Sequence, residues 1–282
     1  KSPDYQAMLR LQAAIYPAGA PERRQPEPAS VKALRIEDAN ALFLARMRPD
    51  QTVFHVASSL PADAVAAALD KAFEGWKAAG ASQHQEGSLP VVRETALETH
   101  VPGTTQANIV AALPAPVEGT RESMAFGLAV HALGGGLHSR LNASLREEKG
   151  WSYGIYASAS GDRGRDNSLL FVSAAVQADR TWDSVAEIRR IIAELAVKPI
   201  SEEEFQSARS AVRAQFLNAF DSAPGLSSFS GALAAMGYGL EDLQKLLADT
   251  DAVTLDEVNR QAAVIAGSPV TLSVAGDKGA MK

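Results

Sequence analysis

The chain has 282 residues, of which 46% are hydrophobic and 21% are charged, and 27 Lys+Arg against 33 Asp+Glu leave a net charge of −6. This globular composition disfavours disorder, collagen and coiled coil, and the acidic balance argues against nucleic acid or an anionic membrane as the main partner. The absence of cysteine excludes disulfides, a thiolate nucleophile and Cys-ligated metals, and no apolar run is long enough to span a bilayer.

The N-terminal third combines helices with one strand. A short helix is expected over residues 5–16, ended by Pro17, and an extended connector with four prolines follows. A second helix is expected over 36–48, and residues 52–58 have the β-rich character of a strand. After Pro61 the apolar side chains recur at helical spacing on one face; they are Val65, Leu69, Phe73 and Trp76.

The middle of the chain holds a glycine-rich helical region between pairs of strands. Strands are expected over 91–101 and 106–113, and a helix over 119–133 ends at three glycines. Leu137, Leu141 and Leu145 form a stripe on a second short helix, for which Gly150 is a natural C-terminal cap. Residues 151–160 and 168–176, joined by a loop rich in Gly, Asp and Asn, predict a β-hairpin.

The last third is mostly helical. A stripe of apolar residues from Trp182 to Leu195 predicts one helix, and Ser201 with Glu204 forms a capping box for the next. Helices near 240–250 and 254–265 precede a final strand over 269–276. The total of about six strands and eight helices predicts an α+β fold, a two-layer mixed sheet covered by helices on one face.

Few residues are suited to metal binding. The five histidines are His55, His84, His100, His131 and His138, and none has the His-x-x-Glu-His or His-Glu-x-x-His spacing that places two imidazoles around zinc. Gly134, Gly135 and Gly136 follow a helix rather than a strand, which favours a turn over a phosphate-binding loop. No metal site is therefore expected within this chain.

The segment from 133 to 153 resembles a family signature. Its matching parts are Leu133-Gly134-Gly135-Gly136, Ser139-Arg140-Leu141, Leu145-Arg146-Glu147 and Gly150 through Tyr153, and the connector Tyr16 to Arg23 matches as well. These residues resemble the insulinase/pitrilysin-like zinc metallopeptidases, which include the mitochondrial processing peptidases, and in particular the half that does not bind zinc. The resemblance implies a LuxS/processing-peptidase-like metallohydrolase half for the fold.

The resemblance also implies that zinc binding and the remaining functions are divided between two homologous halves. Zinc is expected on an inverted His-x-x-Glu-His motif in a homologous partner half or subunit, because that motif is absent here. Residues 1–50 are then the helices and connector from a preceding half, and 51–282 an inactive metallopeptidase half-unit. The start of the chain, without Met, resembles a cut end or a processed one. The expected partners are the zinc-bearing half and an unfolded peptide substrate.

Arg146 and Tyr153 have the seven-residue spacing of the family pair that reaches into the partner's active site. A guanidinium and a phenol are good donors to the oxyanion formed in peptide hydrolysis. Arg146 lies about 100° around the helix from Leu145, so it can point away from the core, and alternation places Tyr153 on the same side as Trp151. The structural alternative is an Arg capping the helix end and a Tyr filling the sheet face.

The predicted function is a non-catalytic half of a zinc metalloendopeptidase, inactive alone, that binds peptide and completes the partner's site. The three glycines either approach the substrate backbone or only form a turn, and an edge strand can bind an extended peptide. The alternative is a structural or assembly subunit of the same family, and a weaker one is a free-standing peptide-binding module. Ala-rich, Arg-over-Lys usage favours a bacterial source, with periplasm and cytoplasm equally open.

Overall fold

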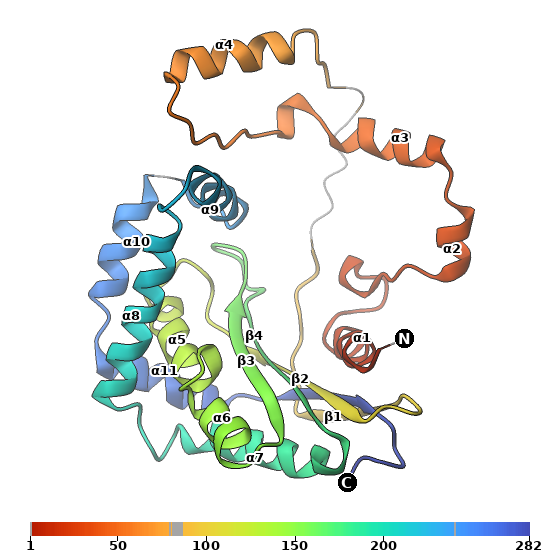
Figure 1. Ribbon diagram of the computed structural model, residues 1–282, viewed down its shortest axis with the longest axis vertical. Coiled ribbons are helices and arrows are strands. Elements are labelled where there is room, and N and C mark those ends of the chain that lie inside the picture. Colours follow the sequence, from red (N-terminus) through yellow and green to blue (C-terminus); the bar gives the residue numbers. More distant parts are fainter. Residues whose placement is uncertain (1, 79, 81–86, 240) are drawn as a thin grey trace.

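The computed structural model of the protein describes residues 2–78, 80, 87–239 and 241–282. Five strands in this part of the chain form one mixed sheet in the order β1-β5-β2-β4-β3 (Figure 1). They are β1 (Thr95–His100), β2 (Gln106–Pro114), β3 (Ser152–Ser160), β4 (Leu169–Gln177) and β5 (Thr271–Gly276). β1 and β5 run parallel, whereas the other pairings are antiparallel. The predicted α+β class and mixed sheet are confirmed.

The predicted hairpin is β3 and β4, and its ladder contains one irregularity. The register shifts between Ser152 and Ile155, so the first residues of β3 do not follow the alternation of the remainder. β1 and β2 are neighbours in sequence but not in the sheet, because β5 lies between them.

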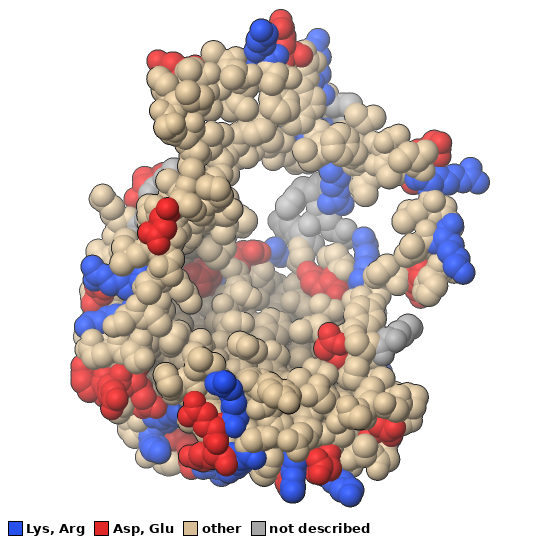
Figure 2. Space-filling model, in the orientation of Figure 1, with Lys and Arg blue, Asp and Glu red and all other residues tan. Residues whose placement is uncertain are grey.

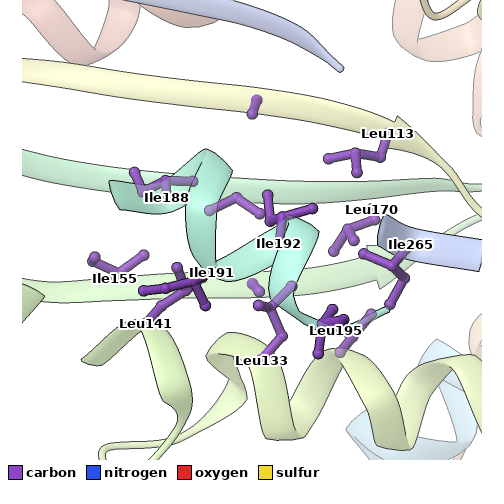
Figure 3. Packing of buried hydrophobic residues seen from close by; sticks show 14 of the residues in the cluster. Leu113, Leu133, Leu141, Ile155, Leu170, Ile188, Ile191, Ile192, Leu195 and Ile265 are labelled. Atoms are coloured by element: carbon purple, nitrogen blue, oxygen red, sulfur yellow. The ribbon is translucent and has the colours of Figure 1, made fainter. Parts of the chain in front are cut away.

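Five helices cover one face of the sheet: α5 (Arg121–Val130), α6 (Arg140–Asn142), α7 (Thr181–Glu194), α8 (Glu202–Asn218) and α11 (Leu255–Gly267). Two π-helical turns complete this layer: the glycine turn (His131–Gly135) and the arginine turn (Ala143–Glu148). Figure 3 shows Leu133, Leu141 and Ile191 meeting Ile155 and Leu170 of the sheet. The stripe predicted for α7 is buried except for Trp182, which is exposed, and the capping box of α8 is present. Leu137, by contrast, is exposed and lies outside the leucine stripe.

The other face of the sheet carries α1 (Pro3–Ile15). Ala7, Leu11 and Ile15 are buried in a second, smaller cluster against Val110 and Ala112 of β2. The N-terminal helix therefore covers part of the sheet face opposite the one that the five helices cover.

Residues 28–78 form an arm that loops away from this body (Figure 1). It carries α2 (Pro28–Ala33), α3 (Ile36–Arg46) and α4 (Ala62–Ala72), none of which has a buried residue. The helices predicted over 36–48 and after Pro61 are confirmed. The strand predicted over 52–58 is wrong for this structure, because the segment is extended but has no paired strand.

The remaining elements lie at the upper end of the body and in the connections. α9 (Ala223–Ala235), which the sequence did not predict, and α10 (Asp242–Asp251) pack beside α8 (Figure 1). Short 3₁₀ turns occur at Pro21–Arg23, Pro49–Gln51 and Ala178–Arg180. Within the described ranges, no helix has both the length and the hydropathy to cross a bilayer.

Candidate functional site

The glycine turn packs tightly against the edge strand β3. A Cβ atom on Gly134 would lie 2.6 Å from the Ala157 Cβ and 3.0 Å from the Ala157 backbone nitrogen. Gly134 is buried, Gly135 is exposed and Gly136 is half-buried, and Cβ atoms on the latter two would meet His131. Close packing against β3 therefore explains why position 134 is a glycine. Gly135 and Gly136 are at least partly exposed, so a ligand can reach them.

Gly134→Ala is expected to destabilise the fold by about 1–3 kcal/mol, because the added methyl group overlaps both a side chain and a backbone atom of β3. The matched control is Gly127→Ala on α5, where the added Cβ would have no neighbour within 4 Å. That variant should be neutral or gain up to about 1 kcal/mol from helix propensity. Urea denaturation of both variants measures the difference, and equal midpoints would contradict the packing role of Gly134.

A buried asparagine holds the glycine turn and β3 together. The Asn142 Nδ2 donates to the Ile155 carbonyl oxygen at 2.8 Å and to that of Gly136 at 3.0 Å, and the Oδ1 accepts from the Ile155 N–H at 3.0 Å. The side chain is 3% exposed. Asn142 thus occupies the N–H and the C=O of Ile155, the two groups with which a further strand would pair. The edge of β3 is therefore blocked to strand addition at this point. Sequence reasoning missed Asn142; its only signal was a polar residue next to the buried leucine stripe.

The arginine turn is anchored to α7 through Glu187. The Ser144 Oγ donates to the Glu187 Oε1 at 2.5 Å, and the Lys149 Nζ lies 3.5 Å from the same oxygen. Arg190 donates two further hydrogen bonds to this carboxylate, both at 2.8 Å. Arg146 lies between Ser144 and Lys149 in sequence, so residues on both sides of it contact Glu187.

Arg190 and, to a lesser degree, Ser144 lower the pKa of Glu187 from 4.5 to about 2. A carboxyl group whose pKa is lower in the folded than in the unfolded protein stabilises the fold at pH values above its unfolded-state pKa. This stabilisation is lost as the pH falls from about 5 towards 2. We expect the loss to be about 2 kcal/mol, since Arg190 is half exposed and water screens the pair. Denaturation at pH 6 and pH 3 measures how much the free energy of unfolding falls between these two pH values. The fall should be smaller for Glu187→Gln than for the wild-type protein. For Glu194→Gln, on the same helix, it should equal that of the wild type. An unchanged decline in Glu187→Gln would contradict this linkage.

Tyr153 lies on the opposite side from the one predicted. Trp151 packs against the main core, whereas Tyr153 is 90% exposed. The predicted common side is wrong because the register shift between Ser152 and Ile155 breaks the two-residue alternation. Tyr153 lines a groove of about 600 Å³ between α1 and the open sheet face, together with Tyr156 and Tyr5.

Arg146 and Tyr153 share one property: neither side chain forms a hydrogen bond with another described residue, and Arg146 has no ion pair among them. Arg146 is half-buried and Tyr153 is exposed. Among the described residues, the Arg146 side chain donates to no carbonyl of a helix end, and the Tyr153 side chain lines the groove over the sheet face while remaining 90% exposed. The two side chains are donors, one cationic and one neutral, available to an acceptor outside this chain.

The described residues do not fit a zinc site. No group of three or more His, Asp or Glu side chains that could hold a metal ion is found among them. His131 lies beside Gly135, and burial lowers its pKa. His100 accepts from the Lys278 N–H at 3.1 Å, and His84 lies outside the described residues.

Residues 33–212 match the family model of the peptidase M16 inactive domain. An uncharacterized zinc protease of Mycobacterium leprae is 25% identical over 83% of this chain, which spans 52% of that relative. An M16 inactive domain of Pseudomonas fluorescens superposes with a TM-score of 0.77 at 17% identity, covering 100% of this chain and 67% of that one. A chain of Complex III2 from Candida albicans gives a TM-score of 0.73 at 15% identity, covering 98% and 67%. The last two likenesses concern the fold alone.

Because the family model covers well over half of the chain, the chain belongs to the peptidase M16 inactive domains. The resemblance inferred from residues 133–153 is confirmed.

Proposed function

We propose that this inactive domain completes the active site of a zinc-bearing M16 half, with Arg146 and Tyr153 binding the peptide group to be cleaved. The proposal rests above all on one observation. Both side chains are donors without a hydrogen bond to any described residue, although the turn that carries Arg146 is anchored by Glu187. A donor that sits on an anchored turn and has no acceptor of its own is available to stabilise an external oxyanion.

Peptide hydrolysis moves negative charge onto the carbonyl oxygen. Arg146 would provide a charge-assisted hydrogen bond to that oxygen, and Tyr153 a neutral one from its hydroxyl group. The zinc ion has no fitting residues in the described part of this chain, so it would belong to the partner half. This division predicts that the chain alone is inactive.

The substrate we propose is an extended, unfolded peptide. The groove beside Tyr153 is lined by three tyrosines and by Met8, surfaces that accept varied side chains through aromatic and apolar contact. Asn142 occupies the β3 edge at Ile155, so strand addition is hindered there, whereas β1 pairs, within the described part of the chain, with β5 alone. Gly135 and Gly136 would lie near the bound backbone.

The test is hydrolysis of a quenched unfolded peptide, with zinc, by this chain alone and by a mixture with a half that carries His-x-x-Glu-His. We expect turnover only in the mixture, and its loss with Tyr153→Phe, which removes one hydroxyl group. Tyr156→Phe, in the same groove, is the matched control and should retain turnover. Turnover by the isolated chain, or a fully active Tyr153→Phe mixture, would contradict the proposed role.

A structural subunit is the second candidate, since the fold is shared with a chain of Complex III2 from Candida albicans. This candidate predicts that the two halves associate but do not cleave peptide. Unpartnered donors at positions 146 and 153 favour the first proposal, because a scaffold gains nothing from them.

A further inference from the structure

A pocket of about 320 Å³ opens between the glycine turn and α8. Residues 131–132 and 136–139 line one side of it, and Glu203, Ser207 and Ala211 of α8 line the other. Its volume lies in the range of about 300–1,000 Å³ that is typical of ligand-binding pockets. Of the residues that line it, the proposed function uses Gly136 alone.

Much of the pocket surface is apolar. Ala132, Leu137 and Ala211 contribute carbon atoms, and this is where the 58% exposed Leu137 lies instead of in the core. The His131 ring packs against the glycines: a Cβ atom on Gly136 would lie 3.4 Å from its Cε1. Burial lowers the pKa of His131, so the ring is uncharged at neutral pH. It therefore presents a flat, neutral wall.

The charged groups around the pocket are paired or exposed. The Glu204 carboxylate accepts two hydrogen bonds from Arg140, at 2.6 and 2.8 Å. Glu203 and His138 are exposed, and Figure 2 shows acidic side chains gathered at the lower left of the body, where α8 begins. An ionic ligand would meet solvated or occupied partners here, whereas an apolar side chain would displace water from carbon surface.

The edge of this pocket is fixed relative to the strand that carries Tyr153. The Asn142 Nδ2 donates both to the carbonyl oxygen of Gly136, which lines the pocket, and to that of Ile155 in β3. Tyr153 lies two residues before Ile155 on the same strand. A peptide held at Tyr153 and passing over the glycine turn would therefore bring a side chain to the pocket.

We propose that the pocket is a subsite for the peptide substrate and takes one large apolar side chain, such as that of leucine. This subsite rests on the proposed function, which brings the peptide backbone to Gly135 and Gly136. Folded proteins bury most of their large apolar side chains, whereas unfolded chains expose them. The pocket would thereby favour unfolded segments that contain such a residue.

The test measures peptide binding by the whole chain without a partner. The probes are blocked twelve-residue peptides of Gly and Ser with one central Leu, Ala or Lys, titrated into the protein at neutral pH. The Leu peptide should bind at least about tenfold more tightly than the Ala or Lys peptide, because its side chain leaves water. A tighter Lys peptide would overturn the proposal, and so would equal affinities.

Variants of α8 assign the preference to this pocket. Ala211→Leu fills the pocket from inside, and Ser207→Leu narrows it from an exposed position one turn earlier, where the fold tolerates the change. Each should reduce the preference for Leu over Ala to less than about twofold. The matched control is Ser210→Leu, next to Ala211 but exposed and outside the pocket, which should keep the full preference. A preference that survives both pocket variants would belong to the groove beside Tyr153 and would overturn the proposal.

The outcomes also separate this subsite from the proposed function. Turnover by the mixture with the zinc-bearing half, without any preference for Leu in the isolated chain, would overturn the subsite and leave the proposed function intact. A preference for Leu that both pocket variants abolish, without turnover by the mixture, would support the subsite and overturn the proposed function.

Discussion

Arg146→Ala is expected to lower the turnover of the assembled peptidase by about 100- to 1,000-fold, or about 2.7–4 kcal/mol of transition-state stabilisation. The loss should appear mainly in kcat, since the oxyanion exists in the transition state and not in the bound substrate. Steady-state kinetics of the mixture with a quenched peptide measures both constants.

The same variant should leave the fold unchanged. Arg146 forms no hydrogen bond or ion pair with a described residue, so its removal should alter the free energy of unfolding by no more than about 0.5 kcal/mol. Glu148→Ala, an exposed position in the same turn, is the matched control and should keep full turnover. If Arg146→Ala retains the wild-type kcat, Arg146 has no part in catalysis.

Asn142→Ala is expected to cost about 3 kcal/mol of stability, the largest effect on the fold among these variants. The change removes four hydrogen bonds of the Asn142 side chain. It leaves the buried N–H and C=O groups of Ile155 without the side-chain partner that they now have. An unsatisfied buried polar group costs about 1–3 kcal/mol. Urea denaturation measures the loss.

Asn142→Asp sharpens this prediction, because a carboxylate can accept from the Ile155 N–H but cannot donate to the two carbonyl groups. It should therefore also be strongly destabilising. Asn218→Ala, at an exposed position near the end of α8, should change stability by no more than about 0.5 kcal/mol. A stable Asn142→Ala protein would show that water replaces the amide and that the closure of β3 is not essential.

The hairpin, the amphipathic α7 and the capped α8 could be predicted because local pattern and tertiary packing agree in them. α9 was not predicted, since Pro224 with Gly225 and Gly231 indicates a loop by propensity. Its N-cap Ser222, which accepts from the Gly225 N–H at 3.1 Å, starts a helix that tertiary contacts then hold.

The site shows the same division between local and tertiary information. The segment from 133 to 153 was found from residue types and spacing alone. The side of the sheet on which Tyr153 lies could not be found in this way, because it is set by a register shift in the pairing of β3 with β4. Asn142 was missed for a similar reason: its partners include Ile155, thirteen residues away on another element.

The position of β5 has a consequence for how the protein is made. β5 lies between β1 and β2, yet its residues 271–276 follow those of every other strand. During synthesis β1 has no strand partner among the described residues until this late segment has left the ribosome, so the sheet is completed only after β5 has been translated. Contacts that join residues about 175 apart in sequence form slowly, because a long loop must close first. Until then the nascent body presents unpaired strand edges of the kind that chaperones bind.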